Sequence, residues 1–322
     1  MVLLLTNCSD RTIGPMRENR IKYRLRQLPF SGHPLQKTDT VYRIRVVQQY
    51  TPGFFSDSYG TQLRNTVTEH SFGIKSVKKM RISVLTMMPE LFGSFLQSPV
   101  VARAIRKESL EVEIVDIRAY APGSFRHIDD SPFGGGAGMV MRCQPVIDAL
   151  RACKNGDARE AEHTVILSPA GTPYTQKKAR ELAKTQHLIL ICGHYEGLDA
   201  RIYPYADEQI SIGDYVLTGG EIAAQVIMDS IARLLPGSLR DASTEEESFE
   251  NGLLEYPQYT QPAVFEGQAV PEVLRSGDHE KIRKWRLQQS LLLTRRMRPD
   301  LFAAHRLTEE ERALLEQAEQ EL

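Results

Sequence analysis

Short continuous apolar runs, separated by segments of helical composition, constrain the fold of this chain more than any other feature. Such runs are typical of parallel strands covered on both faces, and a run that alternates with period 2 is typical of a half-buried strand. Residues 176–185 lie between two of these runs and read as a helix. We therefore predict an α/β fold with a mainly parallel sheet. The predicted strands are Arg81–Met88, Leu110–Ile117 (the alternating run), Thr164–Leu167 and Leu188–Cys192.

Glycine and proline mark the boundaries of further elements. Pro89 ends the first strand, and residues 90–96 read as the start of a helix. Gly219-Gly220 precede a helix over Glu221–Leu235, and Pro236-Gly237 stop it. The stretch that follows, 241–256, is rich in turn residues and holds six carboxylates and no Lys or Arg. We interpret its first part, 241–248, as a linker between two domains.

The rest of the chain reads as helical. Residues 280–297 form an amphipathic, basic segment, and Thr308 with Glu311 makes a capping box for a last helix. The predicted organisation is an α/β domain over 80–240 and a small all-helical domain over 249–322.

A formal net charge of −1 hides two stretches of opposite sign. Residues 1–79 hold 13 Lys/Arg and 5 Asp/Glu, and subtracting these from totals of 40 and 41 leaves 27 and 36 for residues 80–322. Within 1–79 only Tyr42–Val47 suggests a strand. We expect 1–79 to be an extension that is disordered or translated from a start site placed too early. The alternative is a basic arm that binds phosphate backbones.

The composition and the apolar runs exclude several classes of protein. The apolar fraction of 41% is too high for a disordered chain of this length. No apolar run approaches the ~18 residues that span a bilayer, and the N-terminus lacks the charges of a signal peptide. The four cysteines show no C-x-x-C or zinc-ligand spacing. We expect a reduced cytoplasmic protein without a membrane partner or a structural metal.

Three glycine-bearing segments follow strands or precede helices. They are Ile166–Gly171, Cys192–Asp199 and Ser211–Glu221. In open α/β sheets ligands bind beyond the carboxyl ends of the strands, where small residues let the backbone approach the ligand. Together the segments predict a pocket rich in backbone N–H and C=O groups, suited to a purine and an amino-acid moiety. Glycines that only shape tight turns are the alternative for each segment taken singly.

None of the glycine clusters is a known phosphate-binding loop. The chain has no G-x-x-x-x-G-K-[ST], and the cluster Gly134–Gly138 fails G-x-G-x-x-G because Met139 occupies the last place. This cluster also follows a polar loop and not a strand. We therefore do not predict a dinucleotide-binding turn.

Five motifs occur together and in one order. They are Phe133-Gly-Gly-Gly-Ala-Gly-Met139, Leu167-Ser-Pro169, Gly193-His-Tyr-Glu-Gly197, Ser211-Ile-Gly-Asp-Tyr-Val-Leu-Thr-Gly-Gly-Glu221 and Glu280-Lys-Ile-Arg-Lys-Trp-Arg286. The set resembles the TrmD family of bacterial tRNA (guanine-N1)-methyltransferases, which belongs to the SPOUT class. The resemblance covers essentially all of residues 80–322 and none of 1–79.

The resemblance implies that the C-terminal part of the parallel sheet is threaded into a deep trefoil knot that holds S-adenosylmethionine. It also implies a homodimer whose active sites are built from both subunits, and stimulation by Mg²⁺, for which no protein ligand can be assigned. The residues that it assigns to the methyl donor are Leu167, Ser168, Pro169, Gly193, Tyr195, Glu196, Ile212, Gly213, Asp214, Tyr215, Val216, Leu217, Gly219 and Gly220.

Methylation of guanine N1 requires loss of the N1 proton, because the lone pair of the neutral nitrogen is tied up in the ring. In the family an Asp in the linker takes this proton, and an Arg stabilises the charge that develops on O6. The Arg matches Arg233, whose alternative role is a cation at a helix end. The Asp position falls on Glu247, one methylene longer, and Glu246 is the alternative base.

Seven cations lie within 18 residues of the C-terminal region, where the resemblance places tRNA. Such residues position RNA without reading its sequence. We expect Trp285, which lies among them, to belong to the core. In the glycine cluster, Gly135 and Gly136 correspond to the family segment that accommodates the target guanine. The seven cations are Lys281, Arg283, Lys284, Arg286, Arg295, Arg296 and Arg298.

The resemblance therefore implies methyl transfer from S-adenosylmethionine to N1 of guanine 37 in tRNAs where a guanine precedes it. One alternative is another SPOUT methyltransferase, acting on a ribose 2′-hydroxyl or on rRNA. The other is a tRNA-binding protein that has lost catalysis through the change from Asp to Glu.

Overall fold

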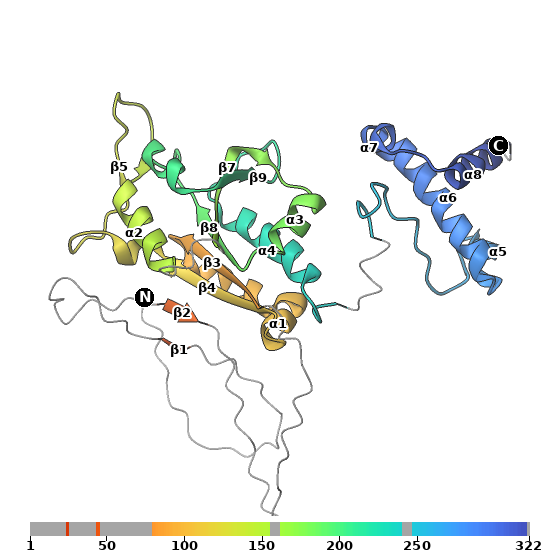
Figure 1. The fold of residues 1–322 in the computed structure, drawn as a ribbon, viewed down its shortest axis with the longest axis horizontal. Coiled ribbons are helices and arrows are strands. Elements are labelled where there is room, and N and C mark those ends of the chain that lie inside the picture. The colour runs from red at the N-terminus through yellow and green to blue at the C-terminus, as the bar shows by residue number, and fades with distance from the viewer. Residues whose placement is uncertain (1–23, 26–42, 46–78, 155–161, 240–246, 321–322) are drawn as a thin grey trace, which may run out of the picture.

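A mainly parallel sheet is the centre of the fold. The computed structural model describes residues 24–25, 43–45, 79–154, 162–239 and 247–320. The order of strands in the sheet is β1-β2-β4-β3-β8-β7-β9, and the five strands from β4 to β9 run parallel. These five are β3 (Met80–Thr86), β4 (Leu110–Asp116), β7 (Glu162–Pro173), β8 (His187–Cys192) and β9 (Glu208–Ser211). The predicted α/β fold is confirmed (Figure 1).

The four predicted strands are all present, and β7 is longer than predicted. It continues past Leu167 to Pro173 through a segment that the sequence suggested to be a loop. Leu167 and Thr172 both lie opposite Ile210 of β9, with a shift of register between them. The strand therefore leaves β9, makes an excursion through residues 168–171, and returns to the same neighbour.

Two short strands lie at the other edge of the sheet. β2 (Arg43–Arg45) confirms the strand predicted within 42–47 and pairs antiparallel with β4. β1 (Arg24–Leu25) pairs antiparallel with β2 and was not predicted, because two residues give no periodicity. The other calls made on 1–79 lie outside the described residues.

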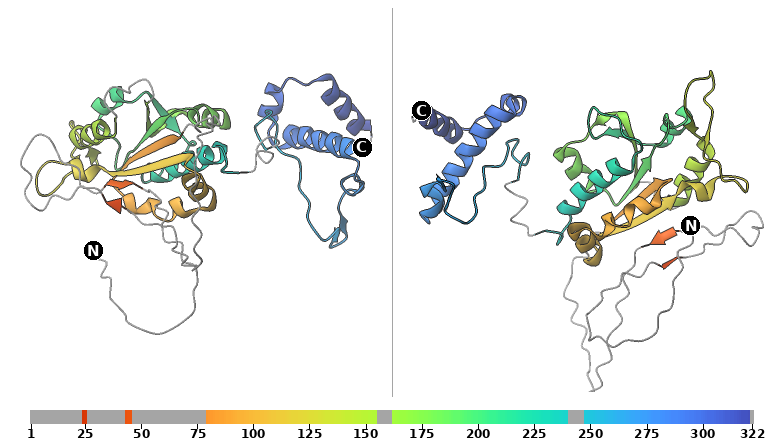
Figure 2. Two further views of the ribbon diagram at one scale, coloured as in Figure 1. Left: turned by 60° about the horizontal axis from the view of Figure 1, so that its bottom comes forward. Right: turned by 180° about the vertical axis from the view of Figure 1, so that it is seen from behind.

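Helices cover both faces of the sheet, and each face has its own core. Adjacent residues of β8 illustrate the division, since Leu190 belongs to one cluster of buried side chains and Ile191 to the other. The first cluster includes α1 (Pro99–Arg106) and α4 (Glu221–Leu234), and the second includes α2 (Cys143–Cys153). Figure 2 shows the same layers from two further sides. Burial on both faces explains the continuous apolar runs.

Three helices of this region were predicted, and one prediction was wrong. The helix over 176–185 is α3 (Gln176–Leu182), and that over 221–235 is α4. Residues 90–96 instead form parts of two short 3₁₀ helices, η1 (Pro89–Phe92) and η2 (Phe95–Gln97). Phe92 and Leu96 are buried, and the tighter 3₁₀ turns place both in the core.

Smaller elements connect the strands. η3 (Ile117–Tyr120) follows β4, and η5 (Ala200–Tyr205) precedes β9. A two-stranded hairpin, β5 (Asp129–Asp130) and β6 (Val140–Met141), carries the glycine cluster at its turn. In Figure 1 this hairpin projects beyond the end of the sheet.

Residues 247–320 hold a group of helices with a small core of their own. The core consists of Leu253, Leu291 and Leu315. The predicted capping box is confirmed, because the Glu311 N–H donates to Thr308 Oγ1 at 3.2 Å and the Thr308 N–H to Glu311 at 2.7 Å. The elements are the hairpin β10 (Val264–Phe265) and β11 (Gln268–Ala269), and the helices α5 (Glu272–Arg275), α6 (His279–Met297), α7 (Pro299–Ala304) and α8 (Glu309–Gln320).

Candidate functional site

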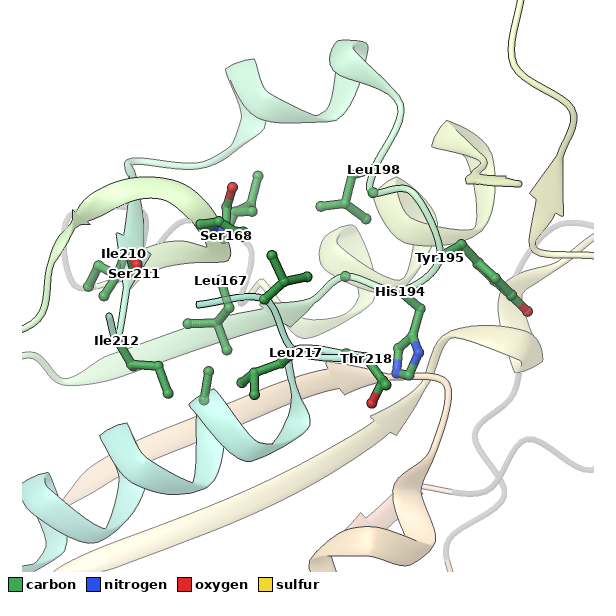
Figure 3. Close-up of a pocket in the computed structure, with 18 of the residues that line it drawn as sticks. Leu167, Ser168, His194, Tyr195, Leu198, Ile210, Ser211, Ile212, Leu217 and Thr218 are labelled. Atoms are coloured by element: carbon green, nitrogen blue, oxygen red, sulfur yellow. The ribbon is translucent and has the colours of Figure 1, made fainter. Parts of the chain in front are cut away.

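A cavity of about 280 Å³ lies beyond the carboxyl ends of β7, β8 and β9. The three glycine-bearing segments converge around it, as predicted. In Figure 3 Leu167 and Ser168 approach it from the first segment, Leu198 from the second, and Ile212 and Leu217 from the third. Its position is the one that ligands occupy in open α/β sheets.

Nearly all the residues assigned to a methyl donor line this cavity. Asp214 does not: its side chain is exposed, in a turn that Gly213 begins at φ 153°. The ring of Tyr215 packs against Gly213 and its hydroxyl donates to the Ile212 carbonyl at 3.2 Å, so the turn directs the intervening Asp214 to solvent. The predicted residues that line the cavity are Leu167, Ser168, Pro169, Gly193, Tyr195, Glu196, Ile212, Gly213, Tyr215, Val216, Leu217, Gly219 and Gly220.

The pocket segments interlock so closely that two positions admit only glycine. A Cβ atom on Gly171 would lie 2.4 Å from the backbone nitrogen of Ile210, and one on Gly220 would lie 2.7 Å from Cα of Cys192. Real Cβ atoms do not approach backbone so closely, so these glycines are required by packing between segments. The alternative role as simple turn formers does not account for them.

A buried hydrogen-bonded chain joins the pocket to the central strand β3. Glu221, the first residue of α4, is 2% exposed and accepts from Thr86 Oγ1 at 2.6 Å. Its other oxygen lies 2.7 Å from Nε2 of His194, which lines the pocket. The ring of His194 lies beside Thr218 in Figure 3. This chain fixes the second and third glycine segments relative to the sheet.

The hydrogen bonds from Thr86 through Glu221 to His194 could not be predicted from the sequence. His194 and Glu221 both lie inside glycine-bearing motifs, but the sequence assigns a role to neither side chain. A glutamate in the first turn of a helix, where carboxylates favour the macrodipole, is an ordinary surface feature, and nothing in the sequence marked Thr86 as its partner. Their separation of 135 residues makes the contact invisible to local patterns.

Cys192, next to the pocket, is not a nucleophile. Burial and then the Glu221 carboxylate raise the pKa of its thiol well above the ordinary value. The neutral thiol therefore packs as a small apolar group.

The predicted catalytic pair is in contact. The guanidinium of Arg233, at the end of α4, donates to the carboxylate of Glu247. The two side chains are 37% and 24% exposed, so both remain accessible. The alternative base Glu246 lies outside the described residues.

The residues after Glu247 are anchored to α3. The carboxylate of Glu250 accepts from Gln176 Nε2 at 3.0 Å and from Arg180 Nε at 3.1 Å. A second guanidinium nitrogen of Arg180 forms an ion pair with the other carboxylate oxygen, so the pairing is bidentate. This fork lies three residues from Glu247 and helps to hold it beside Arg233.

The glycine cluster at the β5–β6 turn adopts a backbone that other residues disfavour. Gly134, Gly135, Gly136 and Gly138 all have positive φ. Gly135 and Gly136, predicted to accommodate a guanine, are exposed and do not line the cavity. Glu196 lies against Gly138 and connects this turn to the pocket.

Most predicted RNA-binding cations of α6 already face carboxylates. Arg283 pairs with Glu280 at 2.9 Å and also with Glu310, Lys281 pairs with Asp278 at 3.2 Å, and Lys284 lies 3.6 Å from Glu280. Arg295 and Arg298 likewise pair with Glu319 and Asp300. The surface of α6 is therefore less positive than the sequence suggested.

Two residues of α6 lie in different surroundings. Arg286 lies over the ring of Tyr256, 4.7 Å from its centroid. Trp285 was expected in the core, and this was wrong: it is partly buried and lies outside the cluster of Leu253, Leu291 and Leu315. Its ring instead faces Tyr259, at 6.3 Å between centroids.

Among the described residues no group of three or more His, Cys, Asp or Glu side chains is arranged to hold a metal ion, so no Mg²⁺ ligand is assigned. Nor does any described helix combine the length and apolar character needed to cross a membrane.

A mainly parallel sheet with a backbone-lined pocket beyond its strand ends defines an α/β ligand-binding protein. The family model described as "tRNA (Guanine-1)-methyltransferase TrmD" matches residues 80–304. The chain therefore belongs to the TrmD family, which confirms the resemblance predicted from its motifs.

Named relatives agree with the family match. A tRNA (guanine-N(1)-)-methyltransferase of Clostridium botulinum is 52% identical over 237 residues, covering 73% of this chain and 97% of the relative. Proteins with the same name from Clostridium perfringens and Ruminiclostridium cellulolyticum are 49% and 53% identical, covering 73% and 69% of this chain and 99% and 96% of the relatives.

Proposed function

We propose that this protein transfers a methyl group from S-adenosylmethionine to N1 of guanine 37 in tRNAs in which a guanine precedes it. The observation that carries the proposal is the cavity formed by three interlocked glycine segments in a chain of the TrmD family. With tRNA as its substrate, the enzyme works in the cytoplasm.

The pocket suits the methyl donor. Its volume of about 280 Å³ is close to the lower end of the range for small-molecule sites. Backbone groups of the glycine segments hydrogen-bond an adenine and an amino-acid moiety, and leucine and isoleucine side chains cover the apolar faces. When bound, S-adenosylmethionine supplies an electrophilic methyl group on a sulfonium.

Glu247 is the proposed base for the N1 proton, and Arg233 is the proposed cation beside O6. Glu247 accepts the N1 proton on its carboxylate, and Arg233 then stabilises the charge that develops on O6. Their contact in the absence of RNA keeps the two groups together. A guanine that enters between them replaces this contact with one bond to each.

The length of α4 supports a dimeric active site. Gly220 lines the donor pocket just before α4, and Arg233 lies 13 residues further along the helix. At 1.5 Å per residue this separation is about 20 Å, far more than an arginine side chain spans. Arg233 therefore serves the pocket of a second copy, and the homodimer belongs to the proposal.

An apolar patch at the start of α4 supports the same conclusion. Ile222 and Val226 lie one helical turn apart and are 55% and 43% exposed. Leu91 of η1 is 43% exposed, and its carbonyl accepts from Gln225 of the same helix. Val216 of the pocket rim is 86% exposed. These side chains form the surface that a second copy covers.

The proposal includes the trefoil knot of the SPOUT class. Two observations support a threaded arrangement of the three segments. β7 pairs with Ile210 twice, and Gly171 and Gly220 fit tightly against neighbouring backbone.

A methyl-transfer assay tests the proposed function. The protein is incubated with a labelled methyl donor and a tRNA that carries guanine at positions 36 and 37, and the modified base is mapped. Label at N1 of guanine 37, and none in a matched tRNA with adenine at 37, is the expected result. Donor binding without label at N1 contradicts the proposal.

The same assay separates the alternatives. Label on a ribose 2′-hydroxyl identifies another SPOUT activity, and binding of donor and tRNA without turnover identifies an inactive homologue. The contact of Arg233 with Glu247 favours base methylation, because transfer to a ribose hydroxyl does not develop charge on a base oxygen.

A further inference from the structure

A second cavity, of about 460 Å³, lies among residues 247–320 and shares no lining residue with the donor pocket. Its wall is formed by the segment before β10, by α5 and by the first turns of α6. The lining combines aromatic rings, amides and arginines: Tyr256, Tyr259, Trp285, Gln258, Arg275 and Arg286. The reaction proposed above gives none of these residues a role in methyl transfer.

The aromatic side chains of this cavity are placed for stacking and not for core packing. Tyr259 is 49% exposed, and its ring faces the partly buried Trp285 with an interplanar angle of 54°. Both rings line the cavity, so a planar ligand inside it would meet them. The small core of these helices is formed elsewhere, by Leu253, Leu291 and Leu315.

Several cations on the outer surface of α6 are paired with carboxylates, whereas an arginine at the cavity is not. On the surface, Lys281, Arg283 and Lys284 face carboxylates. Arg275, at the end of α5, is exposed, lines the cavity and makes no ion pair with any described residue. Arg296, Arg306 and Arg312 are also exposed and make no ion pair with a described residue, but they do not line the cavity, so Arg275 is the cation at the cavity that can meet an anion.

The chemistry of a nucleotide site is defined by planar aromatic faces, amides and a guanidinium without an ion pair. Unstacked bases of RNA stack on aromatic side chains and hydrogen-bond through their edges, while arginine contacts the phosphate. A peptide or lipid ligand would not require this combination.

We propose that this cavity binds one unstacked nucleotide of the tRNA substrate, with its base against Tyr259 and Trp285 and its phosphate toward Arg275. The inference rests on the proposed function for its tRNA. The nucleotide is distinct from the methylated guanine, which the proposed function places between Arg233 and Glu247, because neither of these residues lines the cavity. Once the tRNA is bound at one site, the effective concentration of its nucleotide at the second site is high. A cavity of low intrinsic affinity therefore suffices.

Trp285 reports directly on the cavity, because it is the only tryptophan of the chain. Its fluorescence is followed during titration of the full-length protein with tRNA, while anisotropy of labelled tRNA measures binding independently. We expect quenching of Trp285 that saturates at the same tRNA concentration as the anisotropy. Guanosine and adenosine monophosphates, titrated alone, are expected to quench only at far higher concentrations.

Substitutions test whether the cavity residues contribute to tRNA binding. Tyr259→Ala should weaken tRNA binding about 10-fold, whereas Tyr259→Phe keeps the stacking face and should bind within about 2-fold of the wild type. Arg275→Ala should reduce the slope of log affinity against log salt by about one, and Arg151→Ala, whose side chain pairs with Asp148 on α2 and lines neither cavity, should leave it unchanged. Binding of the methyl donor and the helical circular dichroism signal should be the same in all four, which shows that the α/β part and the C-terminal helices are both folded.

The inference is overturned if tRNA binds without change in Trp285 emission, or if Tyr259→Ala binds normally. Saturation by a mononucleotide at low concentration also overturns it, since the site would then serve a free nucleotide. These outcomes are distinct from failure of the proposed function: quenching by tRNA without methylation leaves the cavity inference standing, and methylation with normal binding by Tyr259→Ala refutes it alone. Absence of tRNA binding refutes both.

Discussion

The guanidinium of Arg233 donates to the carboxylate of Glu247, so the last turn of α4 is in contact with the segment that enters the C-terminal helices. Two groups proposed for opposite tasks, one accepting a proton and one stabilising negative charge, are thus neutralised by each other before the substrate arrives.

Removal of either group should abolish most turnover and leave the methyl donor bound. Glu247→Gln removes the base and should lower kcat by about 10²–10⁴, and Arg233→Ala should lower it by about 10²–10³. Single-turnover kinetics and calorimetric donor binding measure the two effects. Glu247→Asp, which keeps the carboxylate, is the matched control and should retain substantial activity. Normal turnover by Glu247→Gln would transfer the role of base to Glu246 or another group.

Glu221→Ala should destabilise the fold by about 3 kcal/mol, because it leaves buried donors of Thr86 and His194 without an acceptor. Donor affinity should fall as well, since His194 lines the pocket. Glu221→Gln keeps one acceptor and should lose about half as much. Urea unfolding and donor titration provide the measurements. Equal stability of Glu221→Ala and the wild type would show that the chain of hydrogen bonds contributes nothing.

Gly171→Ala should cost about 3 kcal/mol, because the new methyl group would meet the backbone of Ile210 and force two strands apart. Gly93→Ala is the matched control: Gly93 has helical dihedral angles, and its new methyl group would lie 3.6 Å from the nearest atom. This control should be neutral or stabilising by about 0.5 kcal/mol. Thermal and urea unfolding of the two variants, side by side, distinguish local packing from a general intolerance of alanine.

The capping box should make stability depend on pH in the acid range. Burial alone would raise the pKa of Glu311, but the Thr308 amide and His305 lower it more, so the pKa lies below its ordinary value of 4.5. A folded-state pKa below that of the unfolded chain means that the carboxylate stabilises above about pH 4.5 and that this contribution is lost as the pH falls through the folded value.

Glu311→Gln should therefore lose about 1 kcal/mol at pH 7, and the difference from the wild type should disappear at low pH. Urea unfolding from pH 7 to pH 3 measures this difference. A difference that stays constant over the whole range would assign the effect to shape and not to charge.

Much of the fold was predictable because it is written in local patterns. Continuous apolar runs marked β3 and β8, and Thr308 with Glu311 marked the start of α8. The sequence was less informative where tertiary context decides. Residues 90–96 tighten into 3₁₀ turns because Phe92 and Leu96 must reach the core, and β7 continues past Leu167 because β9 lies alongside it.

The site was predictable through motifs and not through its supporting contacts. The glycine segments were recognised because they occur together, which led to the pocket. Charge along the chain was a weaker guide, because the carboxylates that neutralise Arg283 lie three and 27 residues away. Trp285 was misplaced because a helix that is partly apolar does not reveal which of its apolar side chains faces a cavity.

The two contacts of β7 with Ile210 have a consequence for the thermodynamics of ligand capture. Residues 168–171 are held at both ends by the same residue of a neighbouring strand. A rim anchored in this way has few conformations left to lose, so a ligand that meets it incurs little ordering entropy. The entropy of ordering this rim is thus lost when the protein folds and not when the ligand binds. Lengthening the excursion by even one residue should weaken capture without removing a single contact, because the bound shape would become one of many.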